Sequence, residues 1–434
     1  MQTHIMRTLR EIDPDVYNAV VGEERRENTG LELIASENYV SKAVIEAMAS
    51  VLTNKYSEGY PGKRYYGGQE FTDLVENLAI ERAKKLFHAE HVNVQPLSGA
   101  PANIAVYFAL LNPGDVVLGM DLGHGGHLTH GHPVTYMAKI FKFVRYKTHG
   151  TDGHFDFDEI RQIALKEKPK IILCGYSCYP RDLDYNAFQE IADEVGAYTM
   201  MDMAHIAGLI AAKEMNDPFK ARFDVVTTTT HKTLRGPRGG MILSRTEDRY
   251  HDKYNKDSKK NLAQMIDSSV FPGFQGGPHM HQIAGKAVAF GEALKPDFKN
   301  YAAQIRKNAK AMAQRLIELG WTLFTGGTEN HLMLADITKL GLTGKEAQNL
   351  LDEAGITLNK NAYPDDTRPP TDPSGIRIGT PAITTRGMKE SEMKHIADLM
   401  DKVVRNPKDK KIIERVRKDV FDLTAKFPLY KLYK

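Results

Sequence analysis

Five short apolar runs constrain the fold of this chain more than any other feature of its sequence. They span residues 116–120, 171–174, 197–201, 225–228 and 241–243, and helical or turn-like sequence separates them. Continuous apolar runs of this length are typical of strands that are covered on both faces, as in parallel sheets. The sequence therefore predicts an α/β protein with a mostly parallel sheet, which should bind ligands at the carboxyl ends of its strands.

The length of the chain, 434 residues, leaves room for two domains with their own cores. We expect an N-terminal arm over residues 1–30, a large domain over 31–295 and a smaller α/β domain over 296–434. Helices are predicted over residues 71–89, 101–111 and 402–418, and strands of the smaller domain over 322–324, 332–337 and 376–379.

The composition argues against several classes of protein. The 58 basic and 55 acidic residues leave a net charge of +3, which is too balanced for a nucleic-acid binder. The two cysteines, Cys174 and Cys178, have neither the spacing of a zinc site nor the number of a disulfide framework, so we expect buried thiols. Residues 1–10 lack the apolar core of a signal peptide, and no window reaches the roughly 18 apolar residues of a spanning helix. A cytoplasmic protein without membrane contact is predicted.

Lys232 carries the clearest chemical prediction. It follows four threonines at residues 227–230, which overlap the end of an apolar run, and it precedes a glycine-rich turn at 236–240. An amine at the end of a buried strand loses water, so its pKa falls and some neutral, nucleophilic amine exists near neutral pH. The pattern indicates a Schiff-base lysine. The threonine hydroxyls either orient a bound phosphate or only decorate a β-prone strand.

Asp202 and His205 follow another predicted strand. A carboxylate in this position is costly without a partner, and a pyridinium nitrogen would be such a partner, because the pair makes the ring a better electron acceptor. His205 could stack on the same ring. Taken singly, Asp202 could instead cap the next helix and His205 could be structural. Together with Lys232, the two residues favour a cofactor site.

Two further segments carry groups that could bind anions. Residues 98–100, Ser-Gly-Ala, lie between a predicted strand and a predicted helix, where free backbone amides could cradle a phosphate, although a plain helix cap fits equally well. Arg377 interrupts an apolar strand and could hold an α-carboxylate through two parallel hydrogen bonds. A structural salt bridge is the alternative for Arg377.

Two loops remain open to more than one interpretation. Four histidines fall within residues 124–132, but no carboxylate or thiol accompanies them at ligand spacing, so we predict no metal and expect His127 to stack on an aromatic cofactor. Residues 56–68 combine hydroxyls, the carboxylate of Glu58 and glycines in a nonperiodic loop. Such a loop is typical of an active site, although a rigid surface turn has a similar sequence.

From about residue 31 to its end, the chain resembles the serine hydroxymethyltransferases, which are fold-type-I enzymes dependent on pyridoxal phosphate. The resemblance implies an aspartate aminotransferase-like fold, with a mostly parallel seven-stranded sheet in the large domain and a smaller α/β domain after it. The segments that carry the resemblance are residues 33–38, 58–68, 124–131, 202–209, 227–240, 271–278, 359–361 and 374–381.

The resemblance also implies a role for each site residue. Lys232 would hold the cofactor, Asp202 would bind the pyridine nitrogen, His127 would stack on the ring and His205 would lie near the ring oxygen. Ser177 and Tyr66 would contact cofactor or substrate, while Ser98, Gly99 and His231 would bind the phosphate side, helped by Tyr56 and by Gly276 and Gly277 of a neighbouring subunit. Ala100, Thr229 and Arg238 complete the cofactor contacts. The implied catalytic set is Lys232, Glu58, Asp202, His127, Tyr66 and His231.

The remaining implied roles concern the substrates. Ser36 and Arg377 would hold the serine carboxylate, with Tyr66 close by, and Glu58 would be the acid-base group near the serine hydroxyl and the folate. The residues implied to line the pteridine site are Leu122, Gly126, Leu128, Tyr65 and Asn361.

The resemblance implies the reversible conversion of L-serine and tetrahydrofolate to glycine and 5,10-methylenetetrahydrofolate, through an aldimine and a quinonoid. The enzyme would be a homodimer with a shared active site, or a tetramer. Three alternatives stay open: a folate-independent β-hydroxy amino acid aldolase of the threonine type, a glycine acyltransferase, and a catalytically silent scaffold that binds pyridoxal phosphate. The motifs around Glu58 and Asn361 argue against the aldolase, and the sequence carries no signal for an acyl-coenzyme A site.

Overall fold

The computed structural model describes residues 7–432 and is built around a seven-stranded sheet with the strand order β4-β10-β9-β8-β7-β5-β6. β10 runs antiparallel to both of its neighbours, and all other neighbouring strands are parallel. The predicted α/β class and mostly parallel sheet are therefore confirmed. The strands are β4 (His91–Asn93), β5 (Val116–Met120), β6 (Lys142–Tyr146), β7 (Ile171–Gly175), β8 (Tyr198–Asp202), β9 (Val225–Thr229) and β10 (Gly240–Ser244).

Helices cover both faces of this sheet, which is why its strands lack polar alternation. Leu118 and Met201 belong to an apolar cluster that includes residues of α5 and α13, whereas their neighbours Val117 and Met200 belong to a second cluster with α6 and α12. The longer helices of this part of the chain are α5 (Glu70–Phe87), α6 (Gly99–Leu110), α8 (Phe157–Glu167), α9 (Tyr185–Val195) and α13 (Met280–Ala293), and the shorter ones are α4 (Lys42–Met48), α7 (Met137–Ile140), α10 (Ala207–Ala211), α11 (His251–Tyr254) and α12 (Leu262–Ser268).

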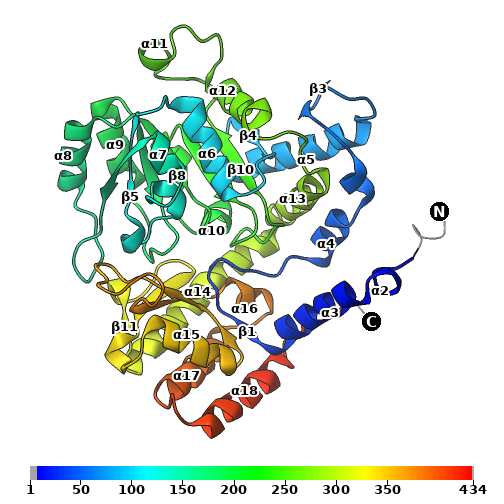
Figure 1. Cartoon of the computed structure of the whole chain (residues 1–434), viewed down its shortest axis with the longest axis vertical. Coiled ribbons are helices and arrows are strands. Elements are labelled where there is room, and N and C mark those ends of the chain that lie inside the picture. Colours follow the sequence, from blue (N-terminus) through cyan, green and yellow to red (C-terminus); the bar gives the residue numbers. More distant parts are fainter. Residues whose placement is uncertain (1–6, 433–434) are drawn as a thin grey trace.

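The C-terminal part of the chain forms a second layer beside the large sheet (Figure 1). Its four-stranded antiparallel sheet has the order β11-β12-β15-β14. The expected strands are found here, with one that was not predicted, β14. The strands are β11 (Thr322–Leu323), β12 (Leu332–Asp336), β14 (Asn359–Asn361) and β15 (Gly375–Gly379), and the helices are α14 (Pro296–Glu318), α15 (Gly344–Glu353), α16 (Pro381–Thr385), α17 (Glu390–Val404) and α18 (Lys410–Thr424).

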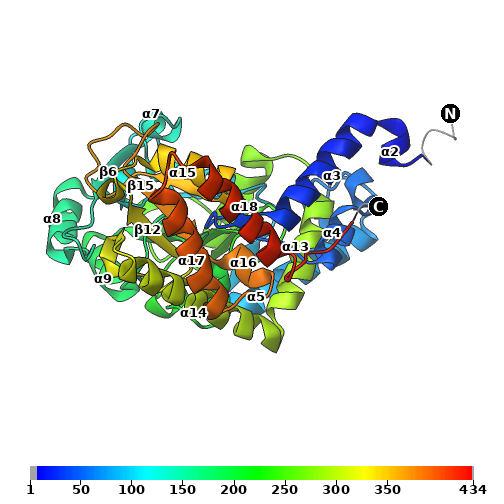
Figure 2. The ribbon, with the colours of Figure 1, turned by 90° about the horizontal axis from the view of Figure 1, so that it is seen from below.

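The single helix predicted over residues 402–418 is wrong. The structure ends α17 at Val404 and begins α18 at Lys410, and the two helices run past one another at the edge of the C-terminal layer (Figure 2). Pro407 lies between them, and the Asp409 carboxylate accepts hydrogen bonds from the first amides of α18. A proline followed by an aspartate cap ends one helix and starts another.

The chain crosses between the two layers near its N-terminus. β1 (Leu31–Glu32) pairs in parallel with β13 (Ile356–Thr357), and both Leu31 and Leu33 are fully buried in the C-terminal apolar core. We expected residue 31 to begin the large domain, yet these first residues pack with the C-terminal one. The division near residue 295 stays a prediction.

The expected N-terminal arm consists, within the described residues, of α2 (Leu9–Ile12) and α3 (Pro14–Thr29), while residues 1–6 of the arm lie outside them. α3 projects from the body of the molecule beside α18 (Figure 2). Cys174 and Cys178 are buried free thiols, as predicted. Within residues 7–432, no helix has both the length and the apolar character needed to cross a membrane.

The packing of Leu33 generates a stability prediction. Leu33→Ala should lower the free energy of unfolding by about 2–5 kcal/mol, because it opens a cavity in the C-terminal core. The urea-induced unfolding transition of the purified variant measures this change. Val51→Ala is the control: the Val51 side chain is 80% exposed, so its loss should change stability by less than about 0.5 kcal/mol. Equal effects of the two substitutions would contradict the packing of residues 31–33.

Candidate active site

The carboxyl ends of the parallel strands converge on a cavity of about 470 Å³. Three neighbouring strand ends supply its floor, because Asp202 closes β8, Ser177 follows β7 and Lys232 follows β9. Glu37, Tyr176 and Ala204 also line it and were not predicted. The predicted site residues that line the cavity are Ser36, Ser98, Gly99, Ala100, His127, Ser177, Asp202, His205, Thr229, His231, Lys232, Arg238 and Arg377.

Lys232 has the properties expected of a nucleophilic amine. Burial lowers the pKa of its ammonium to about 8, although the carboxylate of Asp202 opposes this shift, and Arg377 and Arg238 add to it. At neutral pH about one amine in ten is therefore uncharged. Lys232 is thus able to attack a carbonyl group without a separate base to deprotonate it.

Asp202 is held ionised by its neighbours. Burial alone would raise the pKa of this carboxyl, but its hydrogen bonds with His130 and Asn103 and its electrostatic interactions with His130 and His127 hold the pKa well below its usual value. The Asp202 Oδ2 atom lies 2.8 Å from Asn103 Nδ2 and 3.2 Å from His130 Nε2, and its Oδ1 atom accepts a bond from the backbone of Ala204. A permanently charged carboxylate suits a cationic partner in the cavity.

Asn103 and His130 are functional neighbours that the sequence did not reveal. Asn103 lies on α6 and also accepts a hydrogen bond from Thr227 on β9, so it ties two elements to the Asp202 carboxylate. The position of Asn103, one helical turn after Gly99, is the only sequence signal for this role. His130 belongs to the histidine-rich segment, and it hydrogen-bonds Asp202 without lining the cavity.

His127 stands at the edge of this group. Burial lowers the pKa of its imidazole to about 4, so the ring is neutral at physiological pH, as stacking on an aromatic ligand requires. The Nδ1 atom of His127 bonds to Thr129. The potential ligand atoms of His127, His130 and Asp202 lie within 4.8 Å of one another, a geometry that could also hold a metal ion. The absence of a metal from this site stays a prediction.

His205 lines the cavity but is also paired with a histidine of the C-terminal layer. Its Nδ1 atom lies 3.2 Å from Nε2 of His331, and the two rings stack with centroids 5.4 Å apart. Burial lowers the pKa of both imidazoles, that of His331 to about 3, so the pair is uncharged. His331 was not predicted. The pair joins the two layers at the cavity wall.

One end of the cavity has the features of an anion cradle. α6 begins at Gly99 without a side-chain cap, so its first amides remain free for a ligand. A Cβ atom at Gly99 would approach Thr229 Cγ2 to 2.8 Å, hence only glycine leaves this space open. The Nδ1 atom of His231 is buried and has no hydrogen-bond partner among the described residues, and Arg238 lies beside it. These features fit a phosphate group.

The four threonines at residues 227–230 contribute little to this cradle. The hydroxyls of Thr227, Thr228 and Thr230 donate to Asn103, Thr229 and Pro237 respectively, and all three side chains are fully buried. Of the four threonines, only Thr229 lines the cavity. Three of the four threonines therefore serve the packing and hydrogen bonding of the β-prone strand, and only Thr229 is placed to contact a ligand.

Arg377 lines the same cavity from β15 of the C-terminal sheet. Its guanidinium donates to the side chain of Asn359, to the carbonyl of Ser177 and, at 3.4 Å, to the hydroxyl of Ser36. The residue is 9% exposed, and burial lowers its pKa. Within residues 7–432 no carboxylate forms an ion pair with Arg377, so the predicted alternative of a structural salt bridge is wrong. A buried, unpaired guanidinium is suited to an anionic ligand.

The other predicted catalytic residues, Glu58 and Tyr66, form a separate cluster with three of the predicted cofactor-binding residues. The Tyr56 hydroxyl lies 3.1 Å from the Glu58 carboxylate, and the Tyr56 and Tyr66 rings are in edge contact. Gly276 and Gly277 border Glu58 and Tyr56. None of these five residues is among the described residues that line the Lys232 cavity of the same chain. We call Tyr56, Glu58, Tyr66, Gly276 and Gly277 the Glu58 cluster.

The five residues expected to line a pteridine site are also outside the cavity lining. Leu128 and Tyr65 are 45% and 73% exposed, and Leu122 and Asn361 are half-buried. Gly126 is buried against the backbone of Met120, which a Cβ atom would approach to 2.3 Å, so the loop requires glycine at this position. Their assignment to folate stays a prediction.

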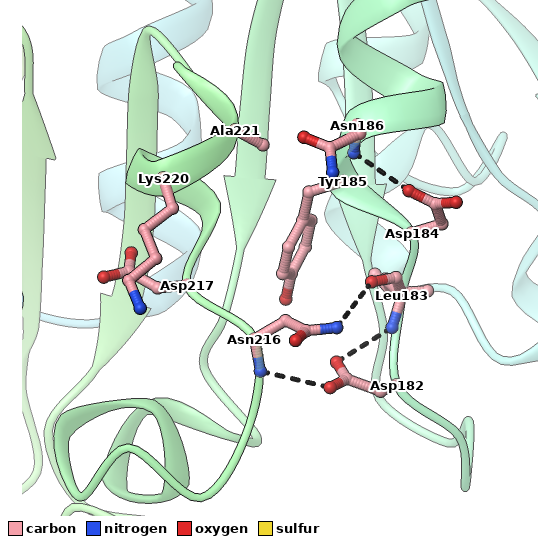
Figure 3. A pocket seen from close by; sticks show the side chains of 9 residues that line it. All are labelled: Asp182, Leu183, Asp184, Tyr185, Asn186, Asn216, Asp217, Lys220 and Ala221. Atoms are coloured by element: carbon pink, nitrogen blue, oxygen red, sulfur yellow. Dashed lines mark hydrogen bonds between the residues drawn. The ribbon is translucent and has the colours of Figure 1, made fainter.

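A second polar pocket lies between the start of α9 and the segment 216–221, and Figure 3 shows its lining. It shares no residue with the cavity of Lys232. Its carboxylates are committed to backbone amides: Asp184 caps α9, Asp217 accepts from Phe219, and Asp182 accepts from Leu183 and Asn216. The carboxylates of this pocket therefore hold the surrounding loops in place. We assign the functional site to the cavity around Lys232.

Comparison with known families agrees with the geometry of this cavity. A family model described as serine hydroxymethyltransferase matches residues 9–400, which include every predicted site residue. The matched range also covers the whole large sheet, β15 and most of α17. The chain therefore belongs to the serine hydroxymethyltransferase family, whose members are fold-type-I transferases that depend on pyridoxal phosphate.

Proposed function

We propose that the protein transfers the hydroxymethyl group of L-serine reversibly to tetrahydrofolate, giving glycine and 5,10-methylenetetrahydrofolate. The observation that carries this proposal is the joint presence, in one cavity, of the amine of Lys232, the ionised carboxylate of Asp202 and the unpaired guanidinium of Arg377. These groups match an aldehyde, a pyridinium and a substrate carboxylate in turn. Membership of the family supports the same assignment.

The cavity residues divide between cofactor and substrate. Pyridoxal phosphate, when bound, supplies an electron sink for the bonds at the substrate Cα atom. The Asp202 carboxylate would keep a proton on the pyridine nitrogen, and the neutral ring of His127 would stack on the cofactor. The phosphate would be held by Ser98, Gly99, Ala100, Thr229, His231 and Arg238.

The substrate side depends on Arg377 and on the Glu58 cluster. The guanidinium of Arg377, with the Ser36 hydroxyl beside it, would fix the serine carboxylate and so orient the Cα–Cβ bond. Glu58 would exchange a proton with the serine hydroxyl and with the folate, and Tyr56 would orient the Glu58 carboxylate through their hydrogen bond. Tyr65, Leu122, Gly126, Leu128 and Asn361 would line the pteridine site.

We also infer that the enzyme is a dimer in which each active site is built from two chains. Within one chain the Glu58 cluster does not line the cavity of Lys232, although the proposed reaction needs both. The cluster is available to a partner, because the side chains of Tyr56 and Tyr66 are 55% and 50% exposed. A two-fold axis would bring the Glu58 cluster of each chain to the Lys232 cavity of the other.

The absorbance spectrum of the purified protein tests the proposed reaction. Pyridoxal phosphate joined to Lys232 should give a visible band, and glycine with tetrahydrofolate should convert it to a strong band at longer wavelength. Glycine alone should give much less of this band. A visible band that ignores tetrahydrofolate would favour the folate-independent aldolase, and a protein loaded with the cofactor that lacks any band would favour the silent scaffold.

Mixed dimers test whether the active site is shared. Lys232→Ala and Glu58→Gln should each be inactive as homodimers. A statistical mixture of the two variants should regain about a quarter of the wild-type activity, because half of the dimers are mixed and each mixed dimer has one intact site. The serine-to-glycine rate of coexpressed chains measures this. If both residues act in one chain, the mixture should stay inactive.

The pKa of Lys232 generates a prediction of pH dependence. Only the uncharged amine attacks an aldehyde, and its fraction increases as the pH rises through about 8. The rate at which the apoenzyme captures pyridoxal phosphate should therefore increase with pH and level off above that value. Stopped-flow absorbance measures this rate. A midpoint near 10.4, the value of an unperturbed lysine, would contradict the lowered pKa.

A further inference from the structure

Lys286, on α13, is a second buried lysine that the proposed reaction does not use. Its side chain is 2% exposed, and it does not line the cavity of Lys232. Its ammonium donates hydrogen bonds to three backbone carbonyls, at 2.6 Å from Val94, 3.1 Å from Pro96 and 2.8 Å from Gly240. All three N–H groups of the ammonium are thereby used.

The setting of Lys286 is that of a structural cation. Within residues 7–432 it forms no ion pair; burial lowers its pKa, whereas the negative charge of Glu76 and the three carbonyl acceptors favour the charged ammonium. The carbonyls come from two chain segments, residues 94–96 and the start of β10. Without Lys286, these buried acceptors would face one another with no donor. Buried carbonyls need donors, and one lysine supplies donors to all three.

These two segments define the anion cradle. Residues 94–98 connect β4 to α6, whose first residues line the cavity. The amide of Gly240 donates to Pro96, and a Cβ atom at Gly240 would approach the Ser98 carbonyl to 2.4 Å. The backbone of β10 is therefore in direct contact with Ser98, and any shift of Gly240 or Pro96 displaces the start of α6.

The side chains of two glutamines, Gln275 and Gln95, also hold the connection 94–98 in place. The amide of Gln275 donates to the carbonyl of Gln95 and accepts from the backbone of Leu97, while the side chain of Gln95 donates to Gly59 and Glu76. Gly59 follows Glu58 in the chain. The connection 94–98 thus joins the cradle of one cavity to the hairpin of β2 (Gly59–Tyr60) and β3 (Lys63–Arg64), which directly follows Glu58.

We propose that Lys286 is a positioning residue for cofactor binding, which fixes the connection 94–98 against β10 and so sets the place of Ser98 and Gly99 in the phosphate cradle. It touches neither cofactor nor substrate. The inference rests on the proposed binding of pyridoxal phosphate in the cavity. It predicts that loss of the Lys286 ammonium weakens the hold on the cofactor without contacting it.

The first test removes the donors and keeps the apolar stem. In Lys286→Met, three buried carbonyls lose a donor, and the dissociation constant of pyridoxal phosphate should rise about tenfold or more. Equilibrium dialysis of the holoenzyme measures it, and the melting temperature of the apoenzyme reports folding. Lys253→Met is the control for loss of a lysine bonded to carbonyls, because the exposed Lys253 donates to two backbone carbonyls, of Val195 and Gly196, away from the cavity. Lys253→Met should bind pyridoxal phosphate with the same dissociation constant as the wild type.

A second variant decides the matter if Lys286→Met does not fold. A Cβ atom at Gly239 would approach Cε of Lys286 to 2.4 Å and Nζ to 3.0 Å, so Gly239→Ala displaces the ammonium without removing it. The dissociation constant should again rise. Gly22→Ala is its control, since a Cβ atom there has no neighbour within 4 Å.

The outcomes separate this inference from the proposed function. Folded Lys286→Met that binds pyridoxal phosphate as tightly as the wild type overturns the positioning role and leaves the reaction untouched. If Lys286→Met does not fold, unchanged binding by Gly239→Ala overturns the role in the same way. A lower melting temperature with unchanged binding assigns Lys286 to general stability and also overturns it. A wild-type protein that does not bind pyridoxal phosphate overturns both proposals.

Discussion

The common direction of the parallel strands is the constraint on which the rest of the structure depends. Because β7, β8 and β9 are parallel neighbours, the residues that follow them meet at one edge although they lie far apart in sequence. Asp202 and Lys232 face the same cavity for this reason. The antiparallel β10 lies between β9 and the edge strand β4 and carries, at its first residue, the backbone that contacts the start of α6.

The charge balance of the cavity follows from this arrangement. Lys232, Arg238 and Arg377 line it together with Glu37 and the ionised Asp202, while the histidines of the wall are neutral because burial lowers their pKa values. Arg377 is buried and has no acidic partner among residues 7–432, which is costly in an empty protein. The cavity is therefore complementary to a ligand that brings negatively charged groups such as a phosphate and a carboxylate.

The sequence predicted those parts of the structure that depend on local pattern. Buried strands were recognised from continuous apolar runs, and Asp202 and Lys232 from their positions at strand ends. The roles of Asn103 and His130 could not be predicted, because both act through the Asp202 carboxylate and only the fold brings them to it. The pairing of Leu31 with Ile356 is equally nonlocal. The helix break at Pro407 is different, because the proline and the aspartate at residue 409 are local signals that end one helix and start another.

The crossing of residues 31–33 into the C-terminal core has a consequence for the order of events during synthesis. A ribosome makes the first strand of that core more than 300 residues before its partner, β13. Until then, the side chains of Leu31 and Leu33 lack the C-terminal core in which they are buried. The large sheet is synthesised while this apolar segment has no partner strand. A fragment that stops after the large sheet would keep this apolar segment exposed, and so would be prone to aggregate in a way that the complete chain is not.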